Sequence, residues 1–448
     1  MSFDERGESA TSNLGDLLEL IIDYRGKTPK KLGGDFADAG IPVISAIHIK
    51  RGKIIWSERE RFVTREMFKK WMKDPLKKGD VLLTSEAPLG EVAMVPNDDD
   101  LVLSQRLFAL RTKRSVLDPK YLMYFLQSNV GQEELRGRSS GSTVVGIKQS
   151  ELVNIPITCP PLSQQRVIGE ILMTLDEKIS ENEKVSSTLE EIASTVFKSW
   201  FLDFDPVKAK MSGKKPAGMS EEVAKLFPES MEETDFGLLP KGWSPDYLGK
   251  HISVTKGKSY KSSELEDSET ALVTLKSFAR GGGYRFDGLK AFSGDFKAEQ
   301  VVEPGELVVS FTDVTQAADV IGKPAIVLSN PQFSQLVASL DVGIVRPRSS
   351  QVGTYFLNQL FLTSVFNSHV RGYTNGTTVL HLGKGALENF TFPLPSSRVL
   401  EAFEEFAKSI FSQIQSLYLQ NLTLQDLRGS LLPRLFSGEL QIPEKMLA

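Results

Sequence analysis

The sequence is poor in the features that mark several large classes of protein. It contains a single cysteine, Cys159, so no disulfide can form within the chain, and a reducing compartment is the simplest setting for it. The first residues lack the basic and then apolar order of a secretion signal. No apolar run approaches the ~20 residues that a membrane-spanning helix needs. We therefore expect a cytoplasmic protein that does not contact a membrane.

Basic residues are not in excess either. The chain has 53 Lys and Arg against 57 Asp and Glu, which gives a formal net charge of −4. This balance argues against a freestanding, strongly basic nucleic-acid binder. It still allows a DNA reader that takes part of its phosphate contacts from a partner. The length of 448 residues and the hydrophobic content of 40% fit two to four domains with proper cores.

Enzyme motifs are incomplete or missing. Gly26–Thr28 and Gly257–Ser259 resemble the end of a phosphate-binding loop, but isoleucine stands where the first glycine of each loop is needed. Asn330–Phe333 resembles the target-base loop of amino-methyltransferases, but it lacks one proline and no glycine-rich cofactor loop precedes it. The four histidines have no metal-ligand spacing. We expect no catalytic site, no metal and no cofactor bound by this chain.

An internal repeat is the strongest feature that the sequence does have. Gly141–Lys148 is similar to Gly376–Gly383, and Arg136 matches Arg371 with the same offset along the chain. A proline and a long amphipathic pattern follow each copy. A repeat of this kind indicates that one structural unit occurs twice. Two similar halves suggest two similar targets held at a set distance.

Each half has a mixed α/β pattern. The β-rich runs of the first half predict strands, and Asp118 followed by proline predicts the start of a helix. The predicted elements are strands at Ile41–Ser45, Asp80–Thr84, Glu91–Val95 and Leu107–Leu110 and a helix at Pro119–Ser128. In the second half, Ser334-Gln335 is taken as the match of Ser104-Gln105.

Two segments, Ser163–Trp200 and Ser397–Leu435, carry apolar residues in heptads that are typical of a coiled coil. Neither helix can bury its apolar stripe alone, so we expect the two to pack on each other in antiparallel fashion. The alternative is that each helix packs only on its own domain. The residues expected to pair the helices are Ile168, Leu172, Leu175, Ile179, Leu189 and Val196 in the first segment and Phe403, Ile410, Ile414, Leu417 and Leu424 in the second.

Polar and basic loops in both halves are the candidates for contacts with DNA. Arginine pairs with guanine edges, asparagine with adenine, and hydroxyl groups with phosphates or bases. The alternative is that the matched loops are turns that close each domain, and both interpretations stay open. The predicted residues are Lys27, Lys30, Lys50, Arg51, Arg136, Arg138, Ser140 and Thr143 in the first half and Lys256, Lys258, Lys276, Arg371, Tyr373, Asn375 and Thr377 in the second.

Several segments resemble the specificity subunits of type I restriction–modification systems. They cover the start and the end of the family's central helix, the approach to its second globular domain, and its C-terminal end. The segments are Pro160–Arg166, Phe197–Val207, Leu226–Pro228, Gly237–Trp243 and Leu431–Leu440. The resemblance extends over the whole chain and is weakest in the globular halves.

The second copy departs from the family at one point, because Leu394–Ser397 replaces the pattern of Pro160–Ser163. The resemblance implies an α+β chain in which two similar α/β target-recognition domains are separated by two long helices. These helices would form an antiparallel coiled coil within a pseudo-twofold internal repeat. The expected boundaries are 1–160 and 241–395 for the recognition domains, 161–202 for the central helix, 203–240 for a linker, 396–436 for the C-terminal helix and 437–448 for a tail.

The resemblance also implies a function. Each recognition domain would read one half of a bipartite site in double-stranded DNA, and the helices would set the spacer and dock two modification subunits. Those partners would methylate adenine with S-adenosylmethionine. Restriction subunits would use ATP and magnesium to cleave DNA, while this chain itself is non-catalytic.

Three alternatives stay open beside this function. The first is the specificity subunit of a methylation-only complex, which the sequence does not separate from the main interpretation. The second is a DNA methyltransferase fused to its recognition domains, against which the missing cofactor and adenine-site motifs argue. The third is a coiled-coil adaptor without DNA specificity, which would not need two matched, loop-rich halves.

Overall fold

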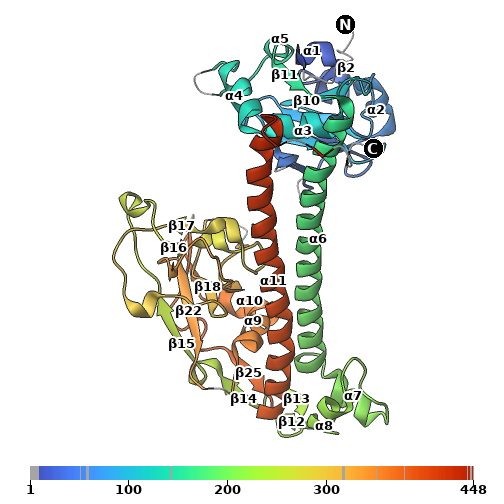
Figure 1. Ribbon diagram of the computed structural model, residues 1–448. Helices are drawn as coiled ribbons and strands as arrows, with labels where there is room; N and C mark the ends of the chain where they lie inside the picture. Colours follow the sequence, from blue (N-terminus) through green and yellow to red (C-terminus); the bar gives the residue numbers. More distant parts are fainter. Residues whose placement is uncertain are drawn as a thin grey trace. The chain divides into compact units, whose positions relative to one another are not determined.

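The computed structural model describes residues 10–50, 52–56, 60–141, 144–314, 318–349, 351–377, 379–440, 442–443 and 446. The chain divides into two compact units, Met1–Glu181 with Asn421–Ala448, and Asn182–Gln420. Each unit contains one globular domain and part of both long helices, α6 (Leu162–Phe201) and α11 (Ser397–Phe436) (Figure 1). The long helices are therefore shared by the two units and do not form a unit of their own.

A four-stranded antiparallel sheet lies at the centre of the first unit. Its order is β2 (Leu18–Asp23), β10 (Leu107–Thr112), β7 (Val81–Thr84) and β8 (Val92–Met94). All four residues of β7 are buried, as in a strand that is covered on both faces. Leu83 packs in the cluster on one face, and Leu82 packs in the cluster on the other.

Helix α3 (Pro119–Gln127) covers one face of this sheet. Its N-cap residue is Asp118, whose carboxylate accepts hydrogen bonds from two first-turn N–H groups at 2.9 and 3.2 Å. Its residues 121–126 are all buried. The reason is that α3 lies between the sheet and the long helices, where the Tyr124 hydroxyl donates to Asp176 of α6 at 2.7 Å.

Smaller elements complete the first unit. On the other face of the sheet, β3 pairs in antiparallel fashion with β6 and in parallel fashion with β9. The bounds are β1 (Ala10–Asn13), α1 (Leu14–Leu17), β3 (Ile41–Ile44), β4 (Ile49–Lys50), β5 (Lys53–Ile54), β6 (Phe62–Val63), α2 (Arg65–Trp71), β9 (Val102–Leu103), α4 (Asn129–Gly137), α5 (Gln149–Leu152) and β11 (Pro156–Cys159).

The second unit repeats this topology, so the repeat predicted from the sequence is confirmed. Helices α9 (Thr354–Leu362) and α10 (Ser364–Arg371) begin after α3 and α4 by the same offset that separates Gly376 from Gly141. The central sheet has the order β15 (Ile252–Lys256), β22 (Val342–Pro347), β18 (Leu307–Ser310) and β20 (Pro324–Ile326). The other strands are β14 (Ser244–Tyr247), β16 (Thr270–Val273), β17 (Lys290–Ala291), β19 (Thr312–Asp313), β21 (Gln335–Ala338), β23 (Thr374–Asn375), β24 (Leu380–Leu382) and β25 (Thr391–Leu394).

One detail of the predicted repeat is wrong. Strand β9 ends at Leu103 and β21 ends at Ala338, so Ser104 corresponds to Ser339 and not to Ser334. Ser334-Gln335 lies at the start of β21 instead of after its end. A dipeptide of two common polar residues carries too little information to fix a register.

The segment between α6 and the second sheet is structured. It contains α7 (Asp205–Met211), α8 (Glu221–Leu226) and a hairpin of β12 (Met231–Thr234) and β13 (Gly237–Pro240). The ring of Phe227 lies 5.2 Å from that of Trp200 on α6, and Phe204 lies 5.7 Å from Trp243. Aromatic packing therefore holds this segment against its own unit.

The two long helices pair in antiparallel fashion in both units. In the first, Asp176 of α6 forms an ion pair with Arg428 of α11, and one turn further along α6 the Ile179 carbonyl accepts a bond from Asn421 at 3.4 Å. In the second, the ring of Phe197 lies 5.6 Å from Phe403, near the start of α11. The alternative that each helix packs only on its own domain is therefore wrong.

The residues predicted to pair the helices differ in burial. Ile168, Leu172, Ile179, Phe403, Ile410 and Ile414 are buried, and Leu175, Leu189, Val196, Leu417 and Leu424 are half-buried. Near the end of α6 the core position is Phe197 and not Val196. An α-helix has about 3.6 residues per turn and drifts away from a strict heptad repeat, so the predicted row leaves the buried face there.

Candidate functional site

Loops with several of the predicted residues, among them Lys27, Lys30 and Lys258, converge on one edge of each central sheet. In the first unit, β2 and β7 end and β10 begins at the same edge, because neighbouring strands run in opposite directions. The segments at this edge are 24–36, 85–91 and 104–106, and we call them the first loop edge. In the second unit the same topology brings 257–269, 311–314 and 339–341 together, and we call these the second loop edge.

The repeated glycine motif forms a hairpin at the first loop edge. Backbone hydrogen bonds join Ser140 and Gly146 in both directions, at 2.9 and 3.0 Å. Gly146 also forms a bridge to Glu86, which follows β7. The hairpin is therefore held against the loop edge by main-chain bonds.

The second unit repeats the same pairing. Asn375 pairs with His381 between β23 and β24, and Thr312 of β19 pairs with His381 from the other side. By the offset of the repeat, Asn375 and His381 correspond to Ser140 and Gly146. The two hairpins thus occupy the same place in the two units.

Each hairpin needs a glycine at its turn. The φ angles of Gly141 and Gly376 are +119° and +113°, in the region that side chains other than glycine rarely adopt. A Cβ atom would lie 2.2 Å from the Val144 carbonyl oxygen in the first hairpin and 2.0 Å from that of Val379 in the second. The repeated glycines therefore have a backbone role that is independent of any ligand.

The structure places the predicted residues of the first half in different settings. The ammonium of Lys27 donates to the Trp71 carbonyl at 2.6 Å, and burial lowers the pKa of Lys27. Arg138 pairs with Glu134 at 3.1 Å. Lys50 lies apart, in the hairpin that borders β8. Lys30, Arg136 and Ser140 are exposed, and Arg51 and Thr143 lie outside the described residues.

The predicted residues of the second half lie on or next to the second loop edge. Tyr373 is half-buried and accepts a hydrogen bond from Asn389 at 3.2 Å. Burial and the charge of Arg371 lower the pKa of Lys323. Lys258 is half-buried, and Lys256, Lys276, Arg371, Asn375 and Thr377 are exposed.

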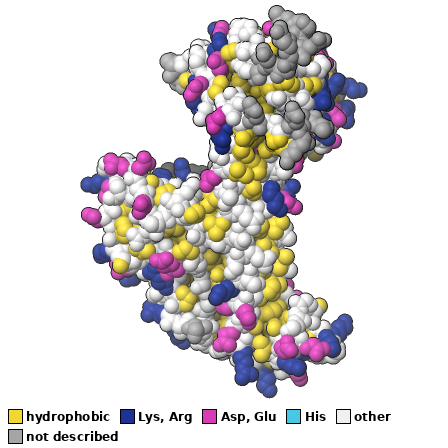
Figure 2. All heavy atoms as spheres, viewed as in Figure 1, with side chains coloured by type: hydrophobic (Ala, Val, Ile, Leu, Met, Phe, Trp, Pro, Cys, Tyr) yellow, Lys and Arg dark blue, Asp and Glu magenta, His cyan; other side chains and the backbone are white. Residues whose placement is uncertain are grey.

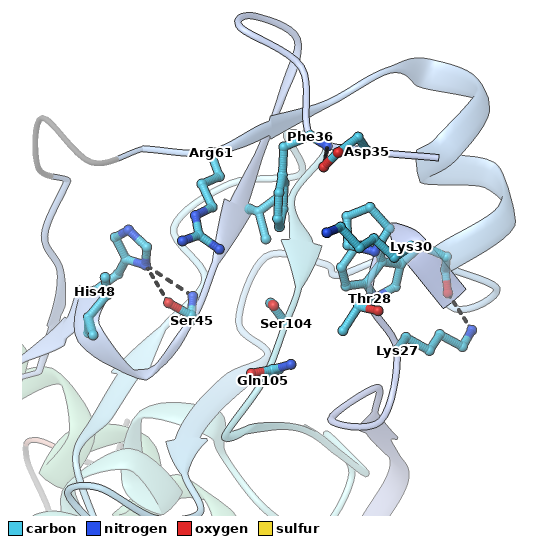
Figure 3. A pocket seen from close by; sticks show the side chains of 14 residues that line it. Lys27, Thr28, Lys30, Asp35, Phe36, Ser45, His48, Arg61, Ser104 and Gln105 are labelled. Carbon is cyan, nitrogen blue, oxygen red and sulfur yellow. Dashed lines mark hydrogen bonds between the residues drawn. The ribbon is translucent and has the colours of Figure 1, made fainter. Parts of the chain in front are cut away.

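Sequence reasoning missed Gln105 and Arg106 of the first loop edge and Arg61, which lies next to it. Arg106 has a φ of +65° and pairs with Glu86 at 3.1 Å. Arg61 and Gln105 line a hollow of about 460 Å³ together with Lys27 and Lys30 (Figure 3). The polar run 104–106 directly after the buried strand β9 is a signal that could have identified Gln105 and Arg106.

A second hollow, of about 540 Å³, lies beside the first and shares Gln105 with it. Its wall includes Arg25, whose guanidinium donates to the Asp23 carboxylate at 2.7 and 2.8 Å and lies 3.9 Å from the centre of the Phe108 ring. Arg25 is thus fixed by its neighbours and shapes the loop edge. The second unit has a hollow of about 290 Å³ with Lys256 and Lys384 in its wall.

Other kinds of site are not found in the part of the chain that the structure describes. Among these residues, no three His, Cys, Asp or Glu side chains come close enough to hold a metal ion. No helix that they form combines the length and the hydropathy of a membrane span. The sole cysteine, Cys159, is buried, and burial raises the pKa of its thiol to about 12, which leaves it a poor nucleophile.

Known proteins share these features. Residues 7–191 match the family described as the type I restriction modification DNA specificity domain. The MjaIX specificity subunit of Methanocaldococcus jannaschii is 26% identical over 427 residues, which cover 94% of this chain and 91% of that subunit. The HindI specificity subunit of Haemophilus influenzae is 25% identical over 414 residues, which cover 82% of this chain and 88% of that subunit.

By these matches, the chain resembles the type I restriction–modification specificity family in sequence. A crystal structure of the type I restriction–modification S subunit from M. genitalium matches over 99% of both chains, with a TM-score of 0.51 and 14% identity, and supports the same fold. Specificity subunits of type I restriction systems are non-catalytic. The likeness to that S subunit supports the fold of this chain, with two similar α/β domains and two long helices.

Proposed function

We propose that this chain is the DNA-specificity subunit of a type I restriction–modification complex. Each loop edge reads one half of a bipartite site in double-stranded DNA. The observation that carries this proposal is the repeat itself: two domains of one topology present the same hairpin, built on Gly141 and Gly376, from the same edge of the sheet. A protein with two matched reading surfaces suits a target with two parts.

The chemistry of the two loop edges supports recognition of DNA. The first presents Lys30 and Gln105 with Arg61 beside it, and Lys256 and Arg371 lie next to the second. Cations neutralise phosphates, while arginine and glutamine side chains pair with base edges in the major groove. Because the two edges carry different side chains on one backbone frame, we expect the two half-sites to differ in sequence.

The long helices set the spacer between the half-sites in this proposal. Half-sites read on one face of the duplex lie about one helical turn apart, ~34 Å. In this proposal, the contacts that pair α6 with α11 inside each unit stiffen the spacer. Removing matched segments from both helices is therefore expected to shorten the unspecified spacer and to leave both half-site sequences unchanged.

The long helices also offer surfaces for partner subunits. In the first unit, a groove of about 540 Å³ on α6 is lined by Val167, Ile171, Leu175 and Met446. In the second unit, Val185 and Ile192 are 42% and 43% exposed on the same helix. Figure 2 shows hydrophobic side chains at the surface of the long helices. Apolar surface of this kind marks sites of association.

We assign these surfaces to two modification subunits, which use S-adenosylmethionine to methylate adenine. Restriction subunits join the same complex and use ATP and magnesium. The chain itself binds none of these cofactors in the proposal. A cytoplasmic location follows from the same assignment, because the DNA that is methylated and cleaved lies there.

The proposal is tested by selecting DNA with the purified complex. The full-length chain and its modification subunits are incubated with a random DNA library, and the bound molecules are sequenced. We expect two short fixed blocks separated by an unspecified spacer of constant length. A single continuous block, or bound DNA without any common sequence, would count against two reading surfaces.

A further inference from the structure

The hollow of the first loop edge has walls that suit a flat aromatic ligand. Its volume of about 460 Å³ falls in the range of small-molecule sites, ~300–1,000 Å³. Phe36 forms one wall, and the guanidinium of Arg61 lies 4.9 Å from the centre of the Phe36 ring. Figure 3 shows the Arg61 guanidinium, the Phe36 ring and the Gln105 amide around the same hollow.

Groups for hydrogen bonding stand around these stacking surfaces. The amide of Gln105 and the hydroxyls of Ser45 and Ser104 line the hollow. A glutamine amide offers a donor and an acceptor side by side, the pattern that pairs with adenine, and hydroxyls bond to any base. Lys30 is exposed at the rim, where an ammonium would meet a phosphate.

Two deeply buried residues of the wall carry polar atoms that no other described residue satisfies. His48 is 3% exposed, and its Nδ1 accepts a hydrogen bond from the Ser45 N–H at 3.0 Å. Its other ring nitrogen, Nε2, has no hydrogen-bond partner among the described residues, and neither has the indole nitrogen of Trp71. Both atoms lie beneath the surface of the wall and are shielded from the hollow itself.

The depth of the hollow decides what part of DNA enters it. Buried residues, Val43 and Trp71 among them, contribute to its wall. A base that stays paired in the duplex presents only its edge in a groove. A base that leaves the stack presents both faces and its pairing edge, which are the groups that an aromatic ring, a guanidinium and an amide recognise.

We propose that this hollow binds one nucleobase that has been turned out of the duplex in the first half-site. The base packs against the contacting pair of Phe36 and Arg61, and its pairing edge meets Gln105. This inference rests on the proposed function and deepens it, because it names the group that the first loop edge recognises. Recognition of this half-site then depends on the ease of unstacking as well as on base contacts.

The test uses 2-aminopurine, a base whose fluorescence rises when it leaves the stack. It is placed at one position at a time in the first half-site, and the DNA is bound by the full-length chain with its modification subunits. We expect a rise at one position other than the adenine that becomes methylated. Phe36→Ala and Arg61→Met are expected to abolish this rise and to weaken binding about tenfold each.

The control is Phe236→Ala, which removes another exposed phenylalanine, in the second unit. It is expected to change neither the fluorescence nor the affinity. Phe36 and Arg61 are both exposed, so their variants are expected to keep the fold, which circular dichroism checks. The inference is overturned if both variants bind DNA with the affinity of the unsubstituted chain and give the same 2-aminopurine fluorescence at every position. Equal affinity for cognate and scrambled DNA would overturn the proposed function as well.

Discussion

The carboxylate of Glu404, on α11, accepts a hydrogen bond from the backbone N–H of Phe356, in the first turn of α9, at 2.5 Å. Its other oxygen accepts from the N–H of Tyr355 at 3.3 Å. A long helix thus caps the N-terminus of a domain helix in the second unit. In the first unit, α3 is capped by its own Asp118 instead.

The repeat shows that the capping carboxylate and a glycine have exchanged positions between the two units. By the offset that relates the two halves, Asp118 corresponds to Gly353, and Gly169 corresponds to Glu404. A Cβ on Gly353 would lie 2.1 Å from the Glu404 carboxyl carbon, and a Cβ on Gly169 would lie 3.3 Å from an Asp118 carboxylate oxygen. Each unit therefore places one carboxylate at the helix start and a glycine at the position that would otherwise crowd it.

Glu404→Ala is expected to destabilise α9 by about 1–2 kcal/mol, because two first-turn N–H groups lose their acceptor. Hydrogen exchange of the α9 amides measures this effect locally. A local measurement is needed because the two units of the chain can differ in stability. The matched control is Glu405→Ala, an exposed neighbour on the same helix. Equal exchange in the two variants would show that the cap contributes nothing.

Gly353→Ala is expected to weaken α9 by pushing the Glu404 carboxylate away from the helix start. In a chain that already carries Glu404→Ala, the same substitution is expected to cost less, because nothing remains to be displaced. A double-mutant cycle on the exchange rates measures this coupling. Additive effects would mean that the glycine is required for another reason.

The stability of α9 is also expected to depend on pH. Burial raises the pKa of Glu404 above its ordinary value of 4.5, and the two backbone hydrogen bonds only partly oppose this. The folded state then holds the proton more tightly than the unfolded state. The contribution of this group is therefore full below pH 4.5 and is lost as the pH rises through the raised pKa. In Glu404→Gln, the stability of α9 that is derived from the exchange rates should lack this pH dependence.

Substitution of each turn glycine is expected to impair the recognition of one half-site and not of the other. Gly141→Ala strains a positive φ and brings a Cβ against a backbone oxygen, which costs more than ~1 kcal/mol locally. Gly141→Ala should reduce sequence discrimination at the first half-site and leave discrimination at the second unchanged. Gly376→Ala should have the converse effect. Gly137→Ala, at a site with free space, is the control. Competition binding with DNA altered in one half-site at a time provides the measurement.

The link between α3 and the long helices is expected to depend on charge. Asp176 accepts hydrogen bonds from the Tyr124 hydroxyl and from Arg428. Arg428→Met leaves a half-buried carboxylate with one partner fewer, and we expect a cost of about 1–3 kcal/mol in the first unit. Arg434→Met, which removes a more exposed ion pair, should cost less than ~1 kcal/mol. Hydrogen exchange of α3 compares the two.

Periodicity explains what could be predicted from the sequence. The heptads located both long helices, and the repeated glycine hairpin located the two domains, because these patterns depend on neighbours along the chain. Long-range relationships escaped prediction. The carboxylate of Glu404 serves a helix that starts far earlier in the chain, at Thr354, and no local pattern marks it.

The candidate site shows the same limit. Lys27 and Arg138 carry charges in loops that the sequence marks as basic, but the fold ties them to the Trp71 carbonyl and to Glu134. Arg61 and Gln105 come from segments well separated in the sequence and line one hollow because β6, β3 and β9 are neighbours in one sheet. Composition identifies cations, whereas topology decides which of them face the same hollow.

The central claim is that two repeated halves specify the two parts of one DNA site. The most direct measurement is a genome-wide map of N6-methyladenine in the source cells, with and without this gene. The account predicts that deletion removes one bipartite methylated motif and that the intact gene restores it. An unchanged map in cells that express the partner subunits would contradict the account.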